Sequence, residues 1–391
     1  MGRTVGTTVR GIRAPIVKEG DNLVHIVTES VLKAMESEGF SLNHRDVIGV
    51  TESLLARAQG NYATTDSIAA AIGEKYSDEI AIVFPILSRN RFSLVLKGIA
   101  KACKKIYLLL NYPSDEVGNC IMDLDTMEKL ELNPYLDVLS EDKYRALFGT
   151  KVLHPFTGVD YIQMYKDLAG NADMEIFLAN DPKVVLNFTK NVLVANVHER
   201  HRTKRILKEA GAEIVYGLDE LLTESINGSG YNPEFGLLGS NSATENSIKL
   251  FPRNSLEAVL AIQAAFQEKT GKNVEVMIYG DGAFKDPMGK IWELADPVVS
   301  PGFTPGLEGT PSEVKLKYIA DNDLKGLEPF KMKAELQKLI KEKEKSGQSM
   351  GTTPRKITDL LGSLCDLTSG SGDKGTPIVL VQGYFDNFAT E

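Results

Sequence analysis

The sequence predicts an α/β fold in which a mixed α+β domain is interrupted by an inserted parallel α/β domain. Strand-like apolar segments alternate with helix-like segments across residues 78–230, which is typical of a parallel sheet covered by helices. A further buried strand, Val274–Tyr279, runs into Gly280-Asp281-Gly282. The length of 391 residues is enough for two or three domains. We therefore expect a discontinuous domain of residues 1–77 and 231–391, with residues 78–230 as the insertion.

The composition limits the classes of partner. The chain is 42% hydrophobic and 25% charged, and its net charge of −9 argues against nucleic acid or an anionic membrane as the main partner. Three cysteines lie far apart and form no CxxC pair, so the sequence indicates neither a disulfide framework nor a zinc site. No apolar run reaches transmembrane length, and we expect a cytoplasmic protein.

The acidic segment after the strand at 274–279 is a candidate metal site. Asp281 stands between two glycines, which let a backbone turn sharply and approach a ligand. Three more acids and two lysines follow within fifteen residues. Strand-end carboxylates beside lysines suit a hard divalent cation bound to phosphate oxygens, although a solvated acidic loop has the same composition.

Two other segments are candidates for phosphate binding. The strand 46–51 runs into polar residues that include Arg57 and could hold phosphate. The alternative interpretation is that Arg57 is an ordinary surface arginine. Residues 366–377 read as a glycine- and serine-rich loop containing Lys374, and successive backbone N–H groups there would cradle phosphate. The loop lacks the Walker pattern. Near the N-terminus, Asp21 is expected to cap a helix that begins at residue 23.

Polar residues also mark the segment 240–247 and the strand ends of the insertion. Glu245 is the only acid of the segment 240–247 and is a candidate metal ligand, although glutamates are usually solvated. In the insertion, Arg89 and Arg91 follow a predicted strand and suit an anionic small molecule. The competing interpretation is that the insertion is a spacer or a dimerisation element.

Taken together, five segments resemble the coenzyme F-420 gamma-glutamyl ligase family, enzymes that add L-glutamate to a deazaflavin precursor using GTP. The resemblance covers about 60% of the chain and leaves out the Rossmann-like insertion at 78–230. The segments are residues 11–23, 46–60, 241–247, 274–293 and 370–383.

The resemblance implies a set of site residues and a homodimer. Glu245 and Asp281 would be metal ligands, and within this site we predict Arg57 and Lys374 as the catalytic residues. Glu245 stands where the family has aspartate, Gly282 where it has threonine, and Arg57 where it has lysine. The implied nucleotide-binding residues are Ala14, Pro15, Ile16, Val17, Glu52, Ser53, Arg57, Gly370, Ser371, Gly372, Asp373, Lys374 and Gly375.

The first functional hypothesis is a GTP- or ATP-dependent ligase that uses Mg²⁺ or Mn²⁺ to join L-glutamate to an acidic small molecule. A metal would neutralise the phosphates, and Arg57 and Lys374 would stabilise developing negative charge. The alternative is a nucleotide- or metabolite-binding protein that has kept this scaffold without ligation and uses its insertion to bind a partner or ligand. In the ligase hypothesis the insertion holds the acceptor through Arg89 or Arg91.

Overall fold

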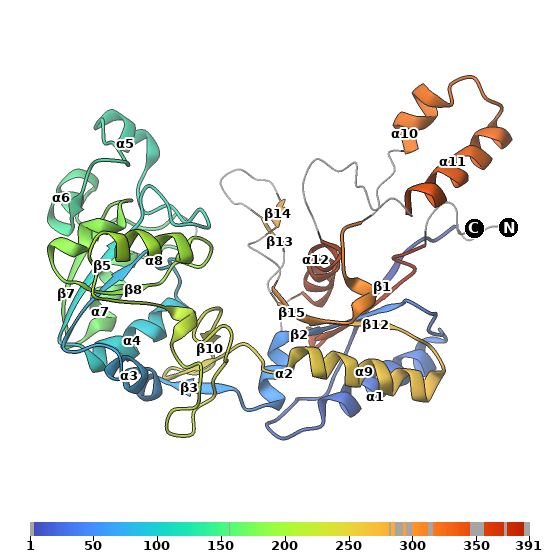
Figure 1. Ribbon diagram of the computed structural model, residues 1–391, viewed down its shortest axis with the longest axis horizontal. Helices are drawn as coiled ribbons and strands as arrows, with labels where there is room; N and C mark the ends of the chain where they lie inside the picture. Colours follow the sequence, from blue (N-terminus) through green and yellow to red (C-terminus); the bar gives the residue numbers. More distant parts are fainter. Residues whose placement is uncertain are drawn as a thin grey trace. The chain divides into compact units, whose positions relative to one another are not determined.

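A computed structural model describes residues 4–155, 157–280, 283–285, 292–294, 299–311, 316–344, 356–370 and 374–386. The chain forms two compact units (Figure 1). Unit 1 comprises Met1–Ala58 and Asn254–Glu391, and unit 2 comprises Gln59–Arg253. Unit 2 therefore contains residues 59–77 and 231–253 in addition to the segment 78–230.

Unit 1 is built on a five-stranded mixed sheet. Its two central strands, β2 and β12, are parallel, and each of the other neighbouring pairs is antiparallel. The order across the sheet is β1 (Thr8–Ile12), β16 (Ile378–Gln382), β2 (Val47–Thr51), β12 (Glu275–Gly280) and β15 (Val299–Phe303). The strands predicted at 46–51 and 274–279 are thus confirmed as the centre of this sheet.

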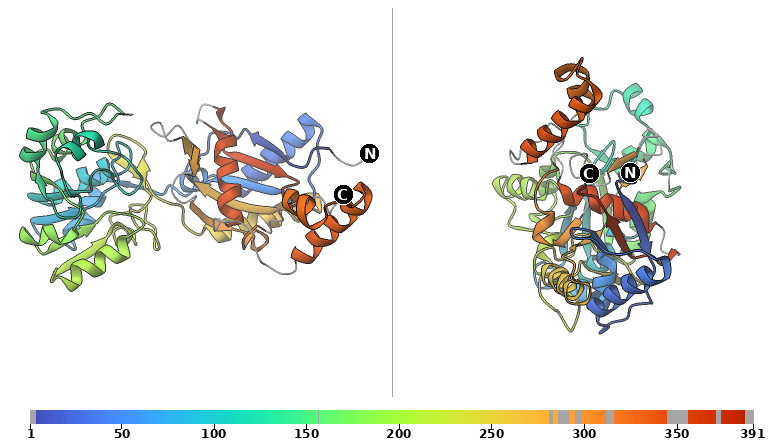
Figure 2. Two further views of the ribbon diagram at one scale, coloured as in Figure 1. Left: turned by 90° about the horizontal axis from the view of Figure 1, so that it is seen from above. Right: turned by 90° about the vertical axis from the view of Figure 1, so that its right-hand side faces the viewer.

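Helices cover both faces of this sheet because its strands are apolar on both sides. Ile48 and Val50 point to the core shared with α1 and α9, whereas Val47 belongs to the core under α12. Figure 2 shows α12 crossing the sheet on one side. The covering helices are α1 (Leu23–Glu38), α9 (Ser255–Thr270) and α12 (Ile357–Ser369), and the short α2 (Glu52–Ala58) follows β2 directly.

Two local expectations for unit 1 were wrong. Asn22, not Asp21, caps α1, because its side-chain oxygen accepts from the backbone N–H of His25 at 3.0 Å. The Asp21 carboxylate instead accepts from the backbone N–H of Lys18. The predicted loop at 366–377 also starts later, because α12 continues to Ser369 before it ends at a glycine with positive φ.

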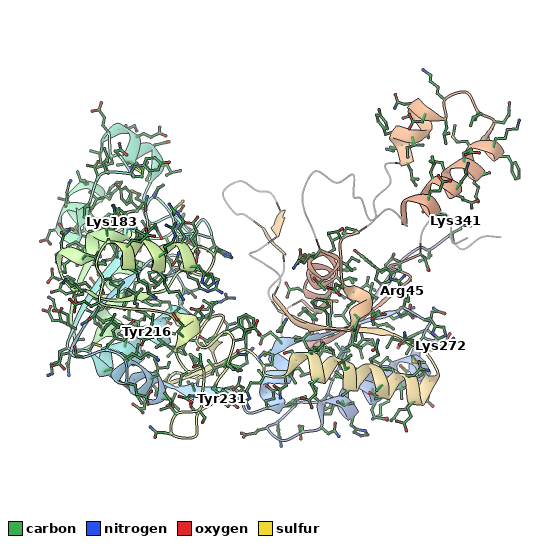
Figure 3. The ribbon with its side chains drawn as sticks, in the orientation of Figure 1. Arg45, Lys183, Tyr216, Tyr231, Lys272 and Lys341 are labelled. Carbon is green, nitrogen blue, oxygen red and sulfur yellow. The ribbon has the colours of Figure 1, made fainter. Side chains whose placement is uncertain are left out.

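The remaining elements of unit 1 are short, apart from one lysine-rich helix. The lysine-rich segment after Glu328 forms α11, and its Leu336 and Ile340 are buried. Arg45 (labelled in Figure 3) lies over the Phe385 ring, with 3.9 Å between its guanidinium carbon and the ring centroid. These elements are β13 (Ala283–Lys285), β14 (Trp292–Leu294), η3 (Pro305–Leu307), α10 (Leu316–Tyr318), η4 (Ile319–Asp323) and α11 (Pro329–Glu344).

Unit 2 contains a six-stranded sheet that is parallel except at one edge. Chain order leads from β4 to β5 and β7 on one side, and then back to β8 and β9 on the other side of β4. The order reverses between β4 and β8, as in doubly wound α/β folds. The strands, in spatial order, are β6 (Leu139–Ser140), β7 (Asp173–Leu178), β5 (Lys105–Leu110), β4 (Glu79–Val83), β8 (Asn191–Val194) and β9 (Ile214–Gly217). The α/β class with a largely parallel sheet is confirmed.

Helical elements lie on both faces of this sheet. On one face, α4 packs so closely against α3 that a Cβ atom on Gly98 would lie 2.5 Å from Ile68 Cγ2. The other face is covered by η1 and α8 around Leu207. The elements are α3 (Thr65–Gly73), α4 (Phe92–Ala102), α5 (Leu124–Lys129), α6 (Glu141–Phe148), α7 (Tyr161–Ala169), η1 (Pro182–Asn187), α8 (Arg200–Glu209) and η2 (Leu218–Glu220).

A small antiparallel sheet and the contacts of Asn61 complete unit 2, close to the points where the chain enters and leaves it. The sheet contains β10 (Asn241–Ser242), β11 (Ser247–Lys249) and β3 (Tyr62–Thr64). Beside it, the buried Asn61 side chain donates to the Phe251 carbonyl oxygen at 2.6 Å and accepts from the Tyr231 backbone N–H at 2.9 Å. Tyr231, labelled in Figure 3, also lies under the Arg253 guanidinium.

Candidate functional site

Four strand ends meet at one edge of the sheet in unit 1. In the pairing register, Ile12 is opposite Ile378, which is opposite Val50. Tyr279 is opposite Thr51. Because β16 is antiparallel to both β1 and β2, its start lies beside their ends, and the end of β12 lies at the same edge. The edge therefore gathers the segments that follow residues 12, 51 and 280 and the segment that precedes residue 378.

Hydrogen bonds join these segments. The Ala14 N–H donates to the Gly375 carbonyl oxygen at 3.2 Å, which ties the opening loop to the tail loop. The Thr51 N–H donates to the Pro377 carbonyl oxygen at 3.0 Å. The Arg57 Nε donates to the Val17 carbonyl oxygen at 3.3 Å, which ties α2 to the opening loop. Three segments predicted to bind nucleotide thus lie together.

The side chains of the opening loop divide into exposed and buried groups. Pro15 is exposed, and Ile16 has 80% of its surface exposed, which is unusual for a large apolar residue. Ala14 is partly buried. Val17 is buried in the core, so only its backbone faces the edge. An exposed isoleucine beside backbone polar groups suits apolar contact with the flat face of a base.

Glu52 is the buried carboxylate of this edge. A Cβ atom on Gly280 would lie 2.7 Å from Glu52 Cγ, so glycine is needed there to leave room for this side chain. From the sequence we explained the glycine by the approach of a ligand, but the neighbour that the structure describes is a side chain of α2. Ser53 is partly buried, and its N–H donates to the Thr51 hydroxyl oxygen at 3.1 Å.

The tail loop brings one cation to this edge. Lys374 is exposed, and its side chain folds over Gly370, where an added Cβ atom would lie 2.6 Å from the lysine Nζ. Gly370 has φ +61°, which a glycine adopts without strain. The predicted residues Ser371, Gly372 and Asp373 lie outside the described residues.

The other predicted residues belong to unit 2, where a hairpin meets the loop after β4. Glu245 is exposed between β10 and β11, and its carbonyl oxygen accepts from Lys97 Nζ at 3.4 Å. Arg91 Nε donates to Asn241 Oδ1 at 3.2 Å. Arg89 is exposed. The structure thus brings the segments of Arg91 and Glu245 together, a link that we did not predict from the sequence.

The predicted metal pair remains a prediction. Asp281 lies outside the described residues, and Glu245 belongs to the other unit. Within the described ranges, no cluster of three or more His, Cys, Asp or Glu side chains is arranged to hold a metal ion.

Two acids that we did not single out from the sequence lie at the carboxyl ends of the parallel strands. Asp115 is buried and accepts from the Leu87 backbone N–H at 2.8 Å, and burial raises the pKa of its carboxyl group. Glu116 accepts from the backbone N–H groups of Val197 and His198. Both acids follow the polar segment Asn111–Ser114, which comes directly after a strand. This position is the signal in the sequence that could have identified them.

Comparisons with known proteins identify the family of the chain. The chain belongs to the F420-0:gamma-glutamyl ligase family, whose model matches residues 11–383. It is also similar to the coenzyme F420:L-glutamate ligase of Methanocaldococcus jannaschii, with 26% identity over 183 residues. That match covers 46% of this chain and 57% of the relative. The family resemblance seen in the sequence is confirmed.

One further structural result concerns membranes. None of the helices in the described ranges is both long enough and apolar enough to span a bilayer.

Proposed function

We propose that this protein is a nucleotide-dependent ligase that forms an amide bond between L-glutamate and an acidic small molecule. The observation that carries the proposal is the convergence of three family-like segments at one edge of unit 1, through the pairs Ala14–Gly375, Thr51–Pro377 and Arg57–Val17. Ligation of this kind needs a phosphorylated acid, so the edge must hold a nucleoside triphosphate.

Each group at the edge has a distinct task in this proposal. Ile16 contacts the base of GTP or ATP, and the backbone around Gly370 and Gly375 lies along the phosphates. Arg57 and Lys374 place positive charge where negative charge develops during transfer. Their exposed positions leave both cations accessible to a ligand.

A divalent cation, Mg²⁺ or Mn²⁺, is part of the proposal. Its ligands would be the carboxylates of Glu245 and Asp281, and carboxylate oxygens are the donors that hard cations prefer. The exposed Glu245 side chain fits such a role. When bound, the cation neutralises charge on the phosphate oxygens.

The acceptor is proposed to bind to unit 2 through Arg89 or Arg91, at the carboxyl ends of the parallel strands. Alanine variants of both arginines should raise the KM for the acid and leave nucleotide affinity unchanged. Unchanged acceptor kinetics in both variants would assign the segment 78–230 a structural role or a role in partner binding. A homodimer is also proposed, and light scattering of the purified protein tests it.

The decisive experiment measures metal-stimulated phosphate release from GTP and from ATP, with L-glutamate and a panel of small acids. Release that requires both an acid and L-glutamate supports ligation. Lys374→Ala should abolish most of it, and Lys338→Ala on α11, an exposed lysine away from this edge, is the matched control.

A second candidate is a nucleotide- or metabolite-binding protein without ligation. The observation that favours it is the set of substitutions at Glu245, Gly282 and Arg57 relative to the family pattern. Tight nucleotide binding without phosphate release under any of these conditions would select this candidate.

A further inference from the structure

The carboxyl edge of the six-stranded sheet in unit 2 is covered by a segment of the chain itself. Strand order reverses between β4 and β8, and the loops after such strands diverge to leave a crevice that binds ligands. Residues 111–121, which follow β5 and are called the strap here, cross this point. The strap is bonded to the loop after β4 and to the loop after β8.

Asp115 holds the strap in shape. Its Oδ1 accepts from the backbone N–H groups of Val117 at 3.1 Å and Asn119 at 2.8 Å. Its Oδ2 accepts from Leu87 N–H at 2.8 Å and from the Asn119 side-chain amide at 2.8 Å. With four donors on a buried carboxylate, the strap is fixed without help from the adjacent glutamate.

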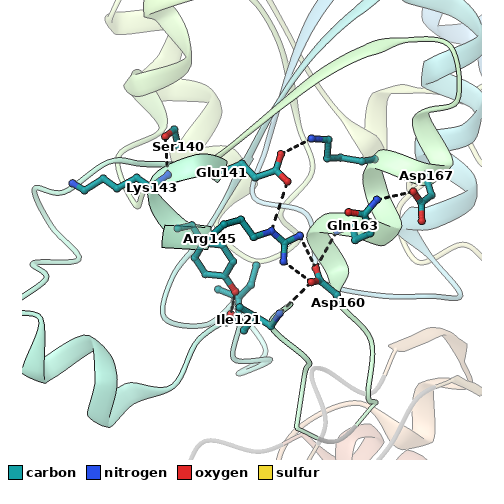
Figure 4. A network of polar contacts seen from close by, with 11 residues as sticks. Ile121, Ser140, Glu141, Lys143, Arg145, Asp160, Gln163 and Asp167 are labelled. Carbon is teal, nitrogen blue, oxygen red and sulfur yellow. Dashed lines mark hydrogen bonds and ion pairs between the residues drawn. The ribbon is translucent and has the colours of Figure 1, made fainter. Parts of the chain in front are cut away.

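The far end of the strap is bonded to α6, which an ion-pair network joins to α7 (Figure 4). Arg145 pairs with Asp160, which also caps α7, and with Glu141 at 3.7 Å. The neighbouring Tyr144 hydroxyl donates to the Ile121 carbonyl oxygen. The strap therefore lies on a rigid support.

Glu116 makes a different kind of contact. Its two carboxylate oxygens accept from two successive backbone N–H groups, those of Val197 at 2.6 Å and His198 at 3.0 Å. Arg200 holds this loop in place through the Val197 carbonyl oxygen at 2.6 Å and through Asp219 at 2.8 Å. Successive amides that point at one oxyanion are the usual protein site for a phosphate or carboxylate group.

A second observation at the same loop points to a ligand. Asn196, directly before these amides, is only 5% exposed, and its Nδ2 donates to the Thr203 hydroxyl oxygen at 3.2 Å. Its Oδ1 is buried and makes no hydrogen bond to any part of the chain that the structure describes. A buried acceptor without a donor is costly, and a ligand that carries an O–H donor beside its oxyanion oxygens, as hydrogen phosphate does, would relieve that cost.

We propose that the amides of Val197 and His198 form an oxyanion subsite of unit 2, and that Glu116 is an internal occupant which the acidic acceptor displaces. This inference rests on the proposed function, since it assigns the acceptor to unit 2. Glu116 is the exchangeable group because Asp115 and Tyr144 hold the strap through other contacts. The shared chemistry of the ligand is an oxyanion, either phosphate or carboxylate.

The test uses the full chain without nucleotide. Hydrogen exchange at Val197 and His198 and titrations with inorganic phosphate and with glutarate are compared among wild type, Glu116→Ala and Glu116→Gln. We expect faster exchange at both amides in Glu116→Ala, about tenfold tighter oxyanion binding, and restored protection on binding. Glu116→Gln should give smaller changes in the same direction. Glu224→Ala, which replaces an exposed glutamate of unit 2, should match wild type.

Two results would each overturn the inference: unchanged exchange at both amides, or unchanged affinity for both probes in both Glu116 variants. Tighter binding of only one probe supports it and identifies the class of oxyanion. Because no nucleotide is present, this outcome is independent of phosphate release. If ligation is absent but the Glu116 variants bind the oxyanion more tightly, only the proposed function is rejected. If ligation is present but oxyanion binding is unchanged, only the subsite is rejected.

Discussion

Asn61 allows a direct test of what stabilises unit 2 near the two points where the chain enters and leaves it. The residue is fully buried, and its side chain serves three partners. Nδ2 donates to the Phe251 carbonyl oxygen, and Oδ1 accepts from the Tyr231 N–H and from the Arg253 guanidinium. Asn61→Ala removes all three bonds at once, from the buried Phe251 and from the partly buried Tyr231 and Arg253.

The expected loss follows from these three bonds. Two neutral hydrogen bonds contribute about 1 kcal/mol each and the charged one about 1.5–3 kcal/mol, so the free energy of unfolding should fall by about 3.5–5 kcal/mol. Urea unfolding followed by circular dichroism measures this loss, and the transition of unit 2 should move to lower urea. Asn191→Ala is the control, since the bond from its side-chain amide to the Glu79 carbonyl oxygen is 3.5 Å long. A loss below about 1 kcal/mol in Asn61→Ala would refute the reasoning.

Three further predictions follow from single contacts. Lys374→Ala should reduce metal-stimulated phosphate release at least about tenfold. The melting temperature should stay unchanged, because the lysine is exposed. A wild-type rate would show that Lys374 is not part of the site. Gly98→Val should lower the free energy of unfolding in urea by at least about 2 kcal/mol, because its side chain would collide with Ile68. Gly73→Ala, where a Cβ atom meets open space, should leave this free energy unchanged. Equal stability of the two variants would contradict the packing argument. Burial lowers the pKa of His154, whose Nδ1 accepts from a backbone N–H. The unfolded chain therefore binds the proton more readily, and stability should fall as pH drops below about 6.5. In His154→Gln the loss between pH 7.5 and 5.5 should be smaller, and an equal loss would exclude this histidine as its source.

Much of the fold was predictable because each local pattern has a single physical solution. Apolar runs such as Val274–Tyr279 and the strands β4 and β8 are buried on both faces, as is typical of central or parallel strands. The ends of helices were harder to predict. At the start of α1, Asp21 and Asn22 are adjacent, and both residue types are common N-caps. The choice depends on which side chain reaches the N–H of His25, and this is set by the turn before the helix.

The candidate site was predictable where it depended on strand ends, and unpredictable where it depended on distant partners. Arg57 and Lys374 each follow or precede a strand, so the sheet register carries them to one edge. Glu116 contacts Val197, which is 81 residues away, and no local pattern signals that pairing. In the same way, the need for glycine at position 280 comes from Glu52, which belongs to another strand–helix turn.

The hairpin that carries Glu245 shows why the segment 78–230 is more than an appendage. The Ser242 N–H donates to the Asn90 carbonyl oxygen at 2.6 Å, and Lys97 donates to the Glu245 carbonyl oxygen at 3.4 Å. Asn90 precedes α4 and Lys97 lies on it, so the insertion fixes the backbone on both sides of the hairpin turn. The segment 241–247 is therefore positioned by residues of the segment 78–230. Any change in the length of the loop after β4 must move the proposed metal ligand as well as the proposed acceptor site, which couples the two within unit 2.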